Sequence, residues 1–282
     1  MRPLLENDLV QLDPDHPGFR DEAYRERRNL IARIAFDYRS GPVPEAPYTE
    51  EEHGVWREVW DHLAPLHRER ACRECVELAD ELGLPRDRVP QLAELNPRLL
   101  ATTGFQMIPV AGLVSGRKFL ERLSERVFLS TQYVRHSARP LYTPEPDVIH
   151  ELVGHAATLI HPQLAELNRR LGQAAIAAGP AGDLDSETPT ALELERVYWY
   201  TLEFGAALQD GAVRAYGAGL LSSYGELQTY TEQAELLPFD LERMAATDYD
   251  PTTYQPRIFV APSFARVLSE VNLWLESRGF KE

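Results

Sequence analysis

The chain has 282 residues, 44% of them hydrophobic, and a formal net charge of -15 at pH 7. An acidic surface repels phosphate backbones and anionic lipids, so nucleic acid and membrane surfaces are disfavoured as partners. The sequence contains no apolar run as long as a membrane span and no apolar signal core at its N-terminus. We therefore expect a cytoplasmic protein with enough apolar sequence to bury a substantial core.

The two cysteines, Cys72 and Cys75, form a C-x-x-C pair. Such a pair can carry redox chemistry or supply half of a zinc site. The sequence has no second cysteine pair to complete a zinc site, and the residues around this one have a helical pattern. We expect two reduced thiols on a helix.

The first hundred residues are predicted to be mainly helical. Residues 1 to about 18 are expected to form an irregular lead. Helices are predicted over residues 20–39, 68–82 and 91–103, with another that begins at Thr49. Thr49 is a good helix cap because three glutamates follow it and favour the first turn. Pro97 could divide the last of these helices.

The segment 104–116 differs from its neighbours because it is apolar and interrupted by glycine and proline. A short strand and a loop are predicted there. Such a backbone can approach a flat ligand closely, and a buried connector is the alternative. A helix over residues 118–125 and a strand or loop over 127–135 follow.

The second half is again predicted to be helical. Its predicted elements are helices over residues 162–178, 187–208 and 263–277, a loop at 179–183, a short strand at 213–218 and a tight turn at 219–226. These patterns predict a predominantly α-helical fold of the α+β type with a few short strands. A single domain over residues 1–282 is the simplest organisation.

The segment around His150 and His155 contains the strongest chemical signal. At about 100° per residue, two residues five apart point roughly 140° away from each other on an ideal α-helix. Zinc peptidases use a four-residue spacing, which puts both imidazoles on one face. His150 can still share a metal with His155 if it lies on the first turn, where Pro144 and Pro146 favour a helix start.

A third ligand is available in Glu203, on the predicted helix over residues 187–208. Two histidines and one carboxylate on one face of a metal leave the opposite face open, as in non-haem iron(II) oxygenases. A zinc-dependent hydrolase that uses Glu151 as its base is the alternative from another class. Metal analysis separates the two hypotheses.

Several runs of sequence occur in the order found in one enzyme family. They are Asp15–Phe19, Pro109–Leu113, Thr131–His136, Tyr142–Asp147, His150–Leu152 with Gly154 and His155, Tyr198 and Trp199 with Glu203–Gly205, and Ala215–Ser223. In these runs the chain resembles the pterin-dependent aromatic amino acid hydroxylases over roughly residues 13–275. The resemblance implies a mainly helical catalytic domain that uses iron(II), a tetrahydropterin such as tetrahydrobiopterin, O2 and an aromatic amino acid.

The resemblance also implies roles for individual residues. The matching iron ligands and catalytic residues are His150, His155 and Glu203. The residues that match the pterin site are Val110, Leu113, Val114, Gly116, Phe119, Glu151 and Tyr198. Phe119 would stack on the pterin ring, and Glu151 would lie on the pterin side rather than bind the metal.

The residues that match the amino acid site are Arg135, Thr143, Pro146, Trp199, Phe204, Gly219, Ser222 and Ser223. Arg135 would pair with the substrate carboxylate, because a planar guanidinium suits a bidentate contact. The side chains of Trp199 and Phe204 would lie beside the substrate ring.

Two positions bear on which amino acid is the substrate. Tryptophan hydroxylases of the family tend to have phenylalanine in place of Trp199, and tyrosine hydroxylases tend to have aspartate at the position of Pro251. Conversion of phenylalanine to tyrosine is therefore the first choice, with tryptophan 5-hydroxylation and tyrosine 3-hydroxylation as alternatives. We expect no regulatory domain and no C-terminal tetramerisation arm, hence a monomer, with pterin-recycling enzymes as functional partners.

Overall fold

The computed structural model describes residue 12, residues 14–179 and residues 188–281. Of the expected irregular lead, residues 14–18 form turns and bends, and the other positions except residue 12 lie outside the described residues. Most of the expected loop at 179–183 also lies outside them.

Helices make up most of the described chain, which confirms the predominantly helical prediction. The α-helices are α1 (Glu22–Asp37), α2 (Glu50–Arg70), α3 (Arg73–Leu82), α4 (Leu92–Thr102), α5 (Gly116–Ser124), α6 (Ala157–Leu159), α7 (Pro162–Ala177), α8 (Pro189–Tyr198), α9 (Ala218–Ser222), α10 (Tyr224–Gln233), α11 (Leu241–Ala245) and α12 (Phe264–Ser277). Two π-helical segments, η1 (His150–Ala156) and η2 (Trp199–Glu203), interrupt this pattern.

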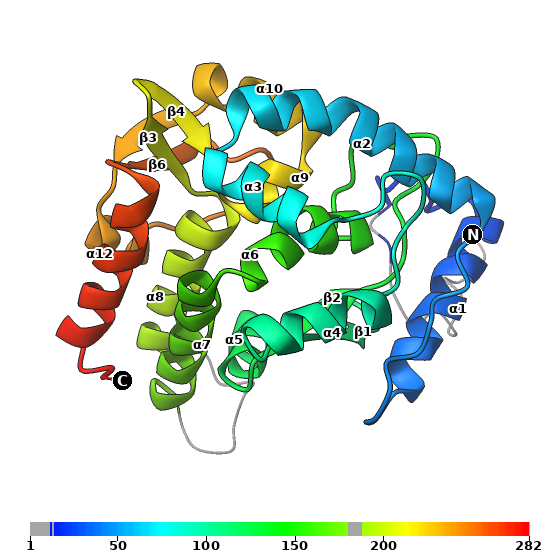
Figure 1. Ribbon diagram of the computed structural model, residues 1–282, viewed down its shortest axis with the longest axis horizontal. Coiled ribbons are helices and arrows are strands. Elements are labelled where there is room, and N and C mark those ends of the chain that lie inside the picture. Colours follow the sequence, from blue (N-terminus) through cyan, green and yellow to red (C-terminus); the bar gives the residue numbers. More distant parts are fainter. Residues whose placement is uncertain (1–11, 13, 180–187, 282) are drawn as a thin grey trace.

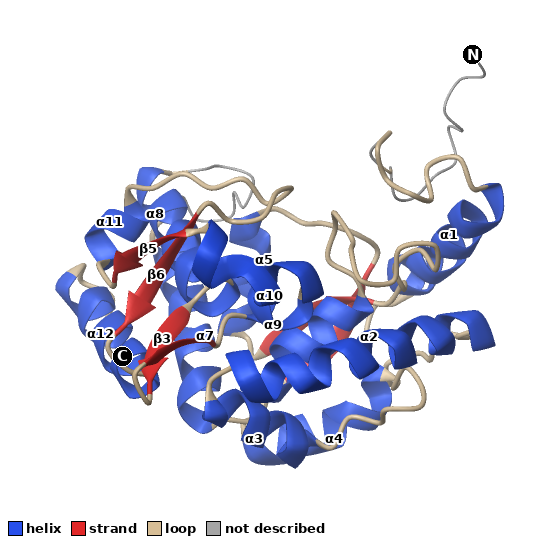
Figure 2. Cartoon of the chain, turned by 90° about the horizontal axis from the view of Figure 1, so that it is seen from above, coloured by secondary structure: helices blue, strands red, loops and turns tan. Residues whose placement is uncertain are grey.

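The strands form two small sheets. Their bounds are β1 (Gln106–Val110), β2 (Val127–Thr131), β3 (Ala206–Gln209), β4 (Ala212–Ala215), β5 (Glu235–Pro238) and β6 (Arg257–Ala261). Strands β1 and β2 are parallel, and the other sheet has the order β4-β3-β6-β5, in which only the β3–β4 pair is antiparallel. The four-stranded sheet lies beside α12 at one end of the molecule, and α1 lies at the other end (Figures 1 and 2).

Local sequence accounts for the best-predicted helices. Thr49 and Glu52 form a reciprocal capping box at the start of α2. Helix α3 ends at Gly83, which adopts a left-handed conformation with φ of 70°. Pro97 lies inside α4 but does not divide it, because the helix continues to Thr102 although proline offers no N–H to the carbonyl four residues earlier.

The predicted helix over residues 187–208 was too long, because the chain leaves the helix at Glu203 and continues as β3. Gly217 makes this departure possible: a Cβ there would lie 2.4 Å from the Glu203 carbonyl oxygen. The predicted tight turn at 219–226 was also wrong, since α9 and α10 occupy those residues. Small residues permit close packing of α9 against η1. A Cβ atom built on Gly154 would lie only 2.9 Å from the Cβ atom of Ala218.

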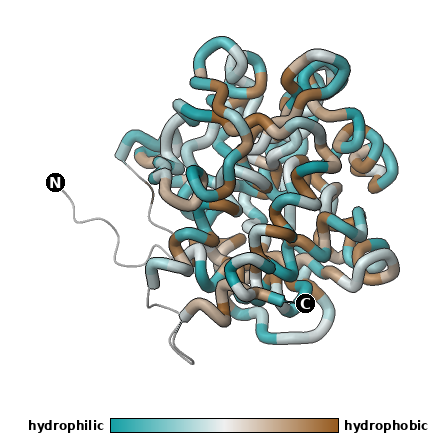
Figure 3. The backbone as a smooth tube through the Cα atoms, turned by 90° about the vertical axis from the view of Figure 1, so that its left-hand side faces the viewer, coloured by the Kyte–Doolittle hydropathy of each residue, from teal (hydrophilic) through white to brown (hydrophobic). Residues whose placement is uncertain are grey.

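One large cluster of buried apolar side chains extends from Val55 on α2 to Leu275 on α12. The η1 segment lies within it, so the two histidines stand on a rigid, buried support. Polar and apolar segments alternate along the helices in Figure 3, as expected for helices that each bury one face. Cys72 and Cys75 are free thiols, as predicted, but only Cys75 lies on α3, because Cys72 immediately precedes it. Within the described residues, we find no helix with the length and apolar character needed to cross a membrane.

Candidate metal centre

The two histidines lie on one face because their helix is not an α-helix. His150 is the first residue of η1, and His155 is the last but one. The hydrogen bonds of this π-helix join residues five apart. The 140° displacement expected for an α-helix therefore does not arise. Pro144 and Pro146 precede the helix, and the Asp147 carboxylate accepts the backbone N–H of His150 at 3.1 Å. His150 lies on the first turn of the helix, as expected, and the π-helical hydrogen bonding that begins there brings its imidazole onto the face of His155.

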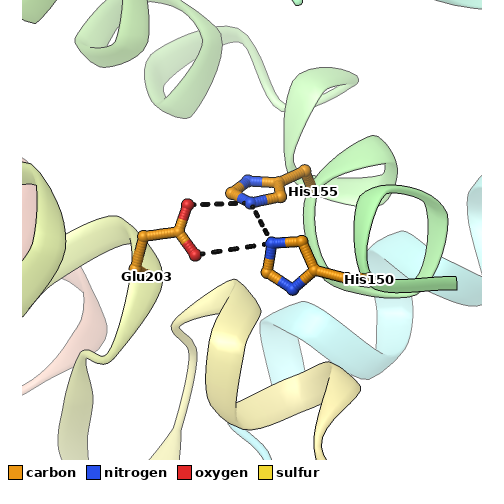
Figure 4. A group of neighbouring side chains, drawn as sticks. All are labelled: His150, His155 and Glu203. Atoms are coloured by element: carbon orange, nitrogen blue, oxygen red, sulfur yellow. Dashed lines mark hydrogen bonds and ion pairs between the residues drawn. The ribbon is translucent and has the colours of Figure 1, made fainter. Parts of the chain in front are cut away.

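Glu203 completes a compact triad with them (Figure 4). Its carboxylate lies 2.9 Å from Nε2 of His155 and 3.7 Å from Nε2 of His150, and the two Nε2 atoms are 3.2 Å apart. Neighbouring ligands at about 2.1 Å from a metal lie roughly 3 Å apart. The three side chains therefore fit a common metal ion, with two nitrogen donors and one carboxylate.

The electrostatics of the triad suit a divalent cation. Burial lowers the pKa of His150 to about 4, which leaves its imidazole neutral and able to bind a metal. Burial also opposes ionisation of Glu203, but the charge and hydrogen bond of His155 outweigh it, so the pKa of Glu203 lies below its ordinary value. Glu203 in turn raises the pKa of His155, so the two side chains share a proton that a bound metal ion would displace.

Ser222 orients the imidazole of His150. The Oγ atom of Ser222 lies 2.8 Å from Nδ1 of His150 and also 2.8 Å from the carbonyl oxygen of Ala218. Because the hydroxyl donates to that carbonyl, its oxygen accepts the Nδ1 proton, and the Nε2 lone pair points at the triad. Ser222, expected to contact the substrate, therefore contacts a metal-site histidine.

Arg135 is held by a buried ion pair. Its Nε and Nη2 atoms donate to the two carboxylate oxygens of Asp147 at 3.0 and 2.8 Å. The side chains of Arg135 and Asp147 are 2% and 0% exposed. Nη1 makes a 3.5 Å contact with the Pro140 carbonyl, so each guanidinium nitrogen has a partner that orients the side chain.

Glu151 is hydrogen-bonded to the end of β2. Its carboxylate accepts the backbone N–H of Thr131 at 3.1 Å and the Thr131 hydroxyl at 3.0 Å. Burial raises the pKa of Glu151 to about 7. A buried carboxyl with this pKa can exchange a proton with a nitrogen heterocycle near neutral pH.

An aromatic series connects the predicted pterin loop to the metal histidines. Phe119 contacts Phe128 and Tyr198 edge to face, with ring centroids 5.3 and 5.5 Å apart, and Phe128 lies 4.7 Å from His155. On the loop itself, Val110 ends β1, and Leu113 is 71% exposed, an unusual state for leucine. Val114 is also exposed, and Gly116 begins α5.

Trp199, which lies on η2 with Glu203, is packed among aromatic rings. It stacks on Tyr249 with a centroid distance of 4.1 Å and lies 4.6 Å from Phe204. Gly219 admits the Phe204 ring, since a Cβ there would come within 2.4 Å of it. The predicted ring-side residues therefore form one cluster.

The remaining predicted substrate residues lie in neighbouring loops. The hydroxyl of Thr143 donates to the Glu145 carbonyl at 2.9 Å, and the Pro146 carbonyl accepts the hydroxyl of Tyr133 at 2.6 Å. Ser223 lies between α9 and α10.

Sequence reasoning missed three residues of this region: Asp147 as the partner of Arg135, Tyr249 as the stacking partner of Trp199, and Gln255, which bonds the Trp199 indole. Asp147 belongs to a run that was singled out for other reasons. Tyr249 and Gln255 carry no local signal, because only folding brings them near Trp199.

Residues 4–279 match the model of the biopterin-dependent aromatic amino acid hydroxylases. The chain belongs to this family.

Named relatives in the family differ in their substrate. The chain is 46% identical over 260 residues to tyrosine 3-monooxygenase of Mus musculus, a match that covers 90% of the chain and 51% of the relative. It is 42% identical over 271 residues to phenylalanine-4-hydroxylase of Caenorhabditis elegans, with coverage of 94% and 58%. The chain therefore spans about half the length of the curated relatives it matches.

Among solved structures, the fold is similar to phenylalanine hydroxylase of Chromobacterium violaceum with bound iron(III) and 7,8-dihydrobiopterin. The TM-score is 0.74 at 31% identity, and the match covers 88% of this chain and 92% of that one. The similarity confirms the expected fold of the family's catalytic domain.

Proposed function

We propose that this chain is an iron(II)- and tetrahydropterin-dependent monooxygenase that uses O2 to convert phenylalanine to tyrosine. The observation that carries the proposal is the triad: two Nε2 atoms and one carboxylate converge with separations of 2.9 to 3.7 Å in a member of the biopterin-dependent family. Bound iron and reduced pterin would supply the activation of O2.

The residues of the chain would bind and orient the reactants. His150, His155 and Glu203 would hold the iron and leave its opposite face open. The Asp147-bound guanidinium of Arg135 would receive the substrate carboxylate, and the aromatic cluster around Trp199 would hold the ring. On the opposite side, Phe119 would contact the pterin ring, and Glu151 would bond its nitrogen edge.

Phenylalanine is favoured over tryptophan because the bulky Trp199 stands beside the expected ring position, stacked and hydrogen-bonded. It is favoured over tyrosine because Pro251 occupies the position where tyrosine hydroxylases tend to have aspartate. Tyrosine 3-hydroxylation is the second candidate, since five animal tyrosine 3-monooxygenases share 45 or 46% identity with the chain.

The deciding experiment supplies the iron-loaded chain with tetrahydrobiopterin, O2 and each of phenylalanine, tyrosine and tryptophan. We expect tyrosine from phenylalanine as the preferred reaction, measured by kcat/KM. Preferred formation of dihydroxyphenylalanine or 5-hydroxytryptophan would overturn the substrate assignment. Zinc-dependent peptide cleavage without pterin-dependent oxygen uptake would overturn the reaction class.

A further inference from the structure

Gln255 connects three separate segments of the chain at the aromatic cluster. Its side-chain oxygen accepts the indole Nε1–H of Trp199 at 2.9 Å, and its backbone N–H donates to the Glu226 carboxylate at 2.6 Å. Its amide nitrogen donates to the carbonyl oxygens of Asp250 and Thr253, each at 2.9 Å. One residue thus joins η2, α10 and the loop at 250–254.

These partners allow only one orientation of the Gln255 amide. In the reverse orientation, the NH2 group would face the Trp199 N–H, and the oxygen would face two carbonyl oxygens. Gln255 is 4% exposed, so each mismatched group would stay desolvated. The amide is therefore held rigidly, and it holds the indole in turn.

The loop that Gln255 holds is otherwise open to solvent. Residues 250–254 are exposed, and the next residue, Gln255, is buried. This loop includes Pro251, the position at which the family's tyrosine hydroxylases tend to differ. The same amide therefore sets the position of the loop relative to Trp199.

We propose that Gln255 is a positioning residue that determines amino acid selectivity by locking the Trp199 indole to the 250–254 loop. The inference rests on the proposed function, because it assigns Trp199 to the substrate ring. A locked indole excludes a larger ring, whereas a released indole can rotate and admit one.

Two variants separate the lock from general folding. Gln255→Leu removes the side-chain hydrogen bonds and leaves Trp199 intact, whereas Trp199→Phe removes the indole donor together with part of the ring's bulk. We expect each to lower the ratio of kcat/KM for phenylalanine to that for tryptophan about tenfold. Because Trp199→Phe already breaks the contact with Gln255, the double variant should show about the same change as Trp199→Phe alone. A ratio within about twofold of wild type in Gln255→Leu, or multiplicative effects in the double variant, would overturn the proposal.

The matched control is Gln91→Leu. Gln91 also clamps backbone, with its amide oxygen and nitrogen each 2.8 Å from the backbone N and O of Ala46, distant in sequence from the aromatic cluster. We expect this variant to lose stability and keep the wild-type selectivity. An equal loss of selectivity in Gln91→Leu would show that loss of any glutamine bonded to the backbone lowers selectivity. That result would contradict a specific role for Gln255.

A direct readout does not depend on catalysis. In spectra of the 15N-labelled chain loaded with diamagnetic Zn(II), the indole N–H signal of Trp199 is identified as the signal that Trp199→Phe lacks. We expect Gln255→Leu to shift this signal and to speed its exchange with water. An unchanged signal would overturn the lock alone, whereas a wild-type chain that hydroxylates none of the three amino acids would overturn the proposed function as well.

Discussion

The hydroxyl of Ser222 on α9 holds the imidazole of His150 on η1 through a 2.8 Å hydrogen bond across 72 residues of sequence. This contact fixes the tautomer that leaves Nε2 free for a metal. It also makes the geometry of the metal site depend on the close packing of α9 against η1.

Substitution of Ser222 should therefore weaken iron binding. For Ser222→Ala we expect iron affinity to fall about 10- to 100-fold, because the imidazole loses its orienting acceptor. Equilibrium titration with Fe(II) under anaerobic conditions measures this change. Ser223→Ala is the matched control, since Ser223 makes no side-chain capping bond, and its iron affinity should equal that of wild type. Equal weakening in both variants would contradict the orienting role.

Variants of Glu203 and Glu151 should differ in the amount of iron that they bind. Glu203→Gln loses a charged ligand of the triad, so we expect iron affinity to fall at least about 100-fold. Glu151→Gln should retain stoichiometric iron, because the Glu151 carboxylate bonds Thr131 rather than the triad. Its defect should appear as a raised KM for the pterin. Metal analysis after gel filtration and pterin titrations test both expectations, and iron loss in Glu151→Gln would contradict the assignment.

The buried pair of Arg135 and Asp147 should matter for folding as well as for substrate binding. Asp147→Ala leaves the guanidinium charge buried and unpaired, so we expect a loss of about 3–5 kcal/mol in unfolding free energy. Glu270→Ala breaks an exposed pair with Arg266 and should cost less than about 1 kcal/mol. Urea unfolding measures both, and similar losses would refute the importance of burial.

Arg135 itself should act mainly on the amino acid. For Arg135→Lys we expect a raised KM for phenylalanine, because an ammonium cannot make the two-pronged contact. Steady-state kinetics at saturating pterin measures the change. An unchanged KM would count against the carboxylate contact.

Glu226 should give the stability of the protein a characteristic pH dependence. Burial raises its pKa from 4.5 to about 7. Between these values the folded chain keeps a proton that the unfolded chain has released, so the unfolding free energy falls as pH rises. Glu226→Gln should remove up to about 3 kcal/mol of this fall. Measuring the unfolding free energy of both proteins at pH 5 and pH 8 tests this prediction, and an equal change with pH in the two proteins would contradict it. Glu151 is also buried with a raised pKa, so the variant should keep part of the fall in unfolding free energy.

Several features of this protein follow from local sequence. The cap at Thr49 and the glycine at position 83 determine helix ends through nearby backbone atoms, and periodic apolar residues determine which helix face is buried. The metal-binding residue types, the run around His150 and the resemblance to the family were also readable, because they depend on residue identity and order.

Other features depend on contacts that no local pattern encodes. The chain between Glu203 and β3 reads as helix, yet pairing with β6 and the close approach of Gly217 end the helix there. Likewise, a five-residue histidine spacing is ambiguous on an ideal helix, and burial of η1 in the core stabilises the π-turn that resolves it.

The amide of Gln255 is the clearest case. Nothing near residue 255 in the sequence points to Trp199, and their hydrogen bond arises only when η2, α10 and the 250–254 loop pack together. Sequence alone determined which residue types could bind a metal and an aromatic amino acid. Tertiary packing decided which side chains orient them, since hydrogen bonds between distant segments form only when folding brings both partners out of water.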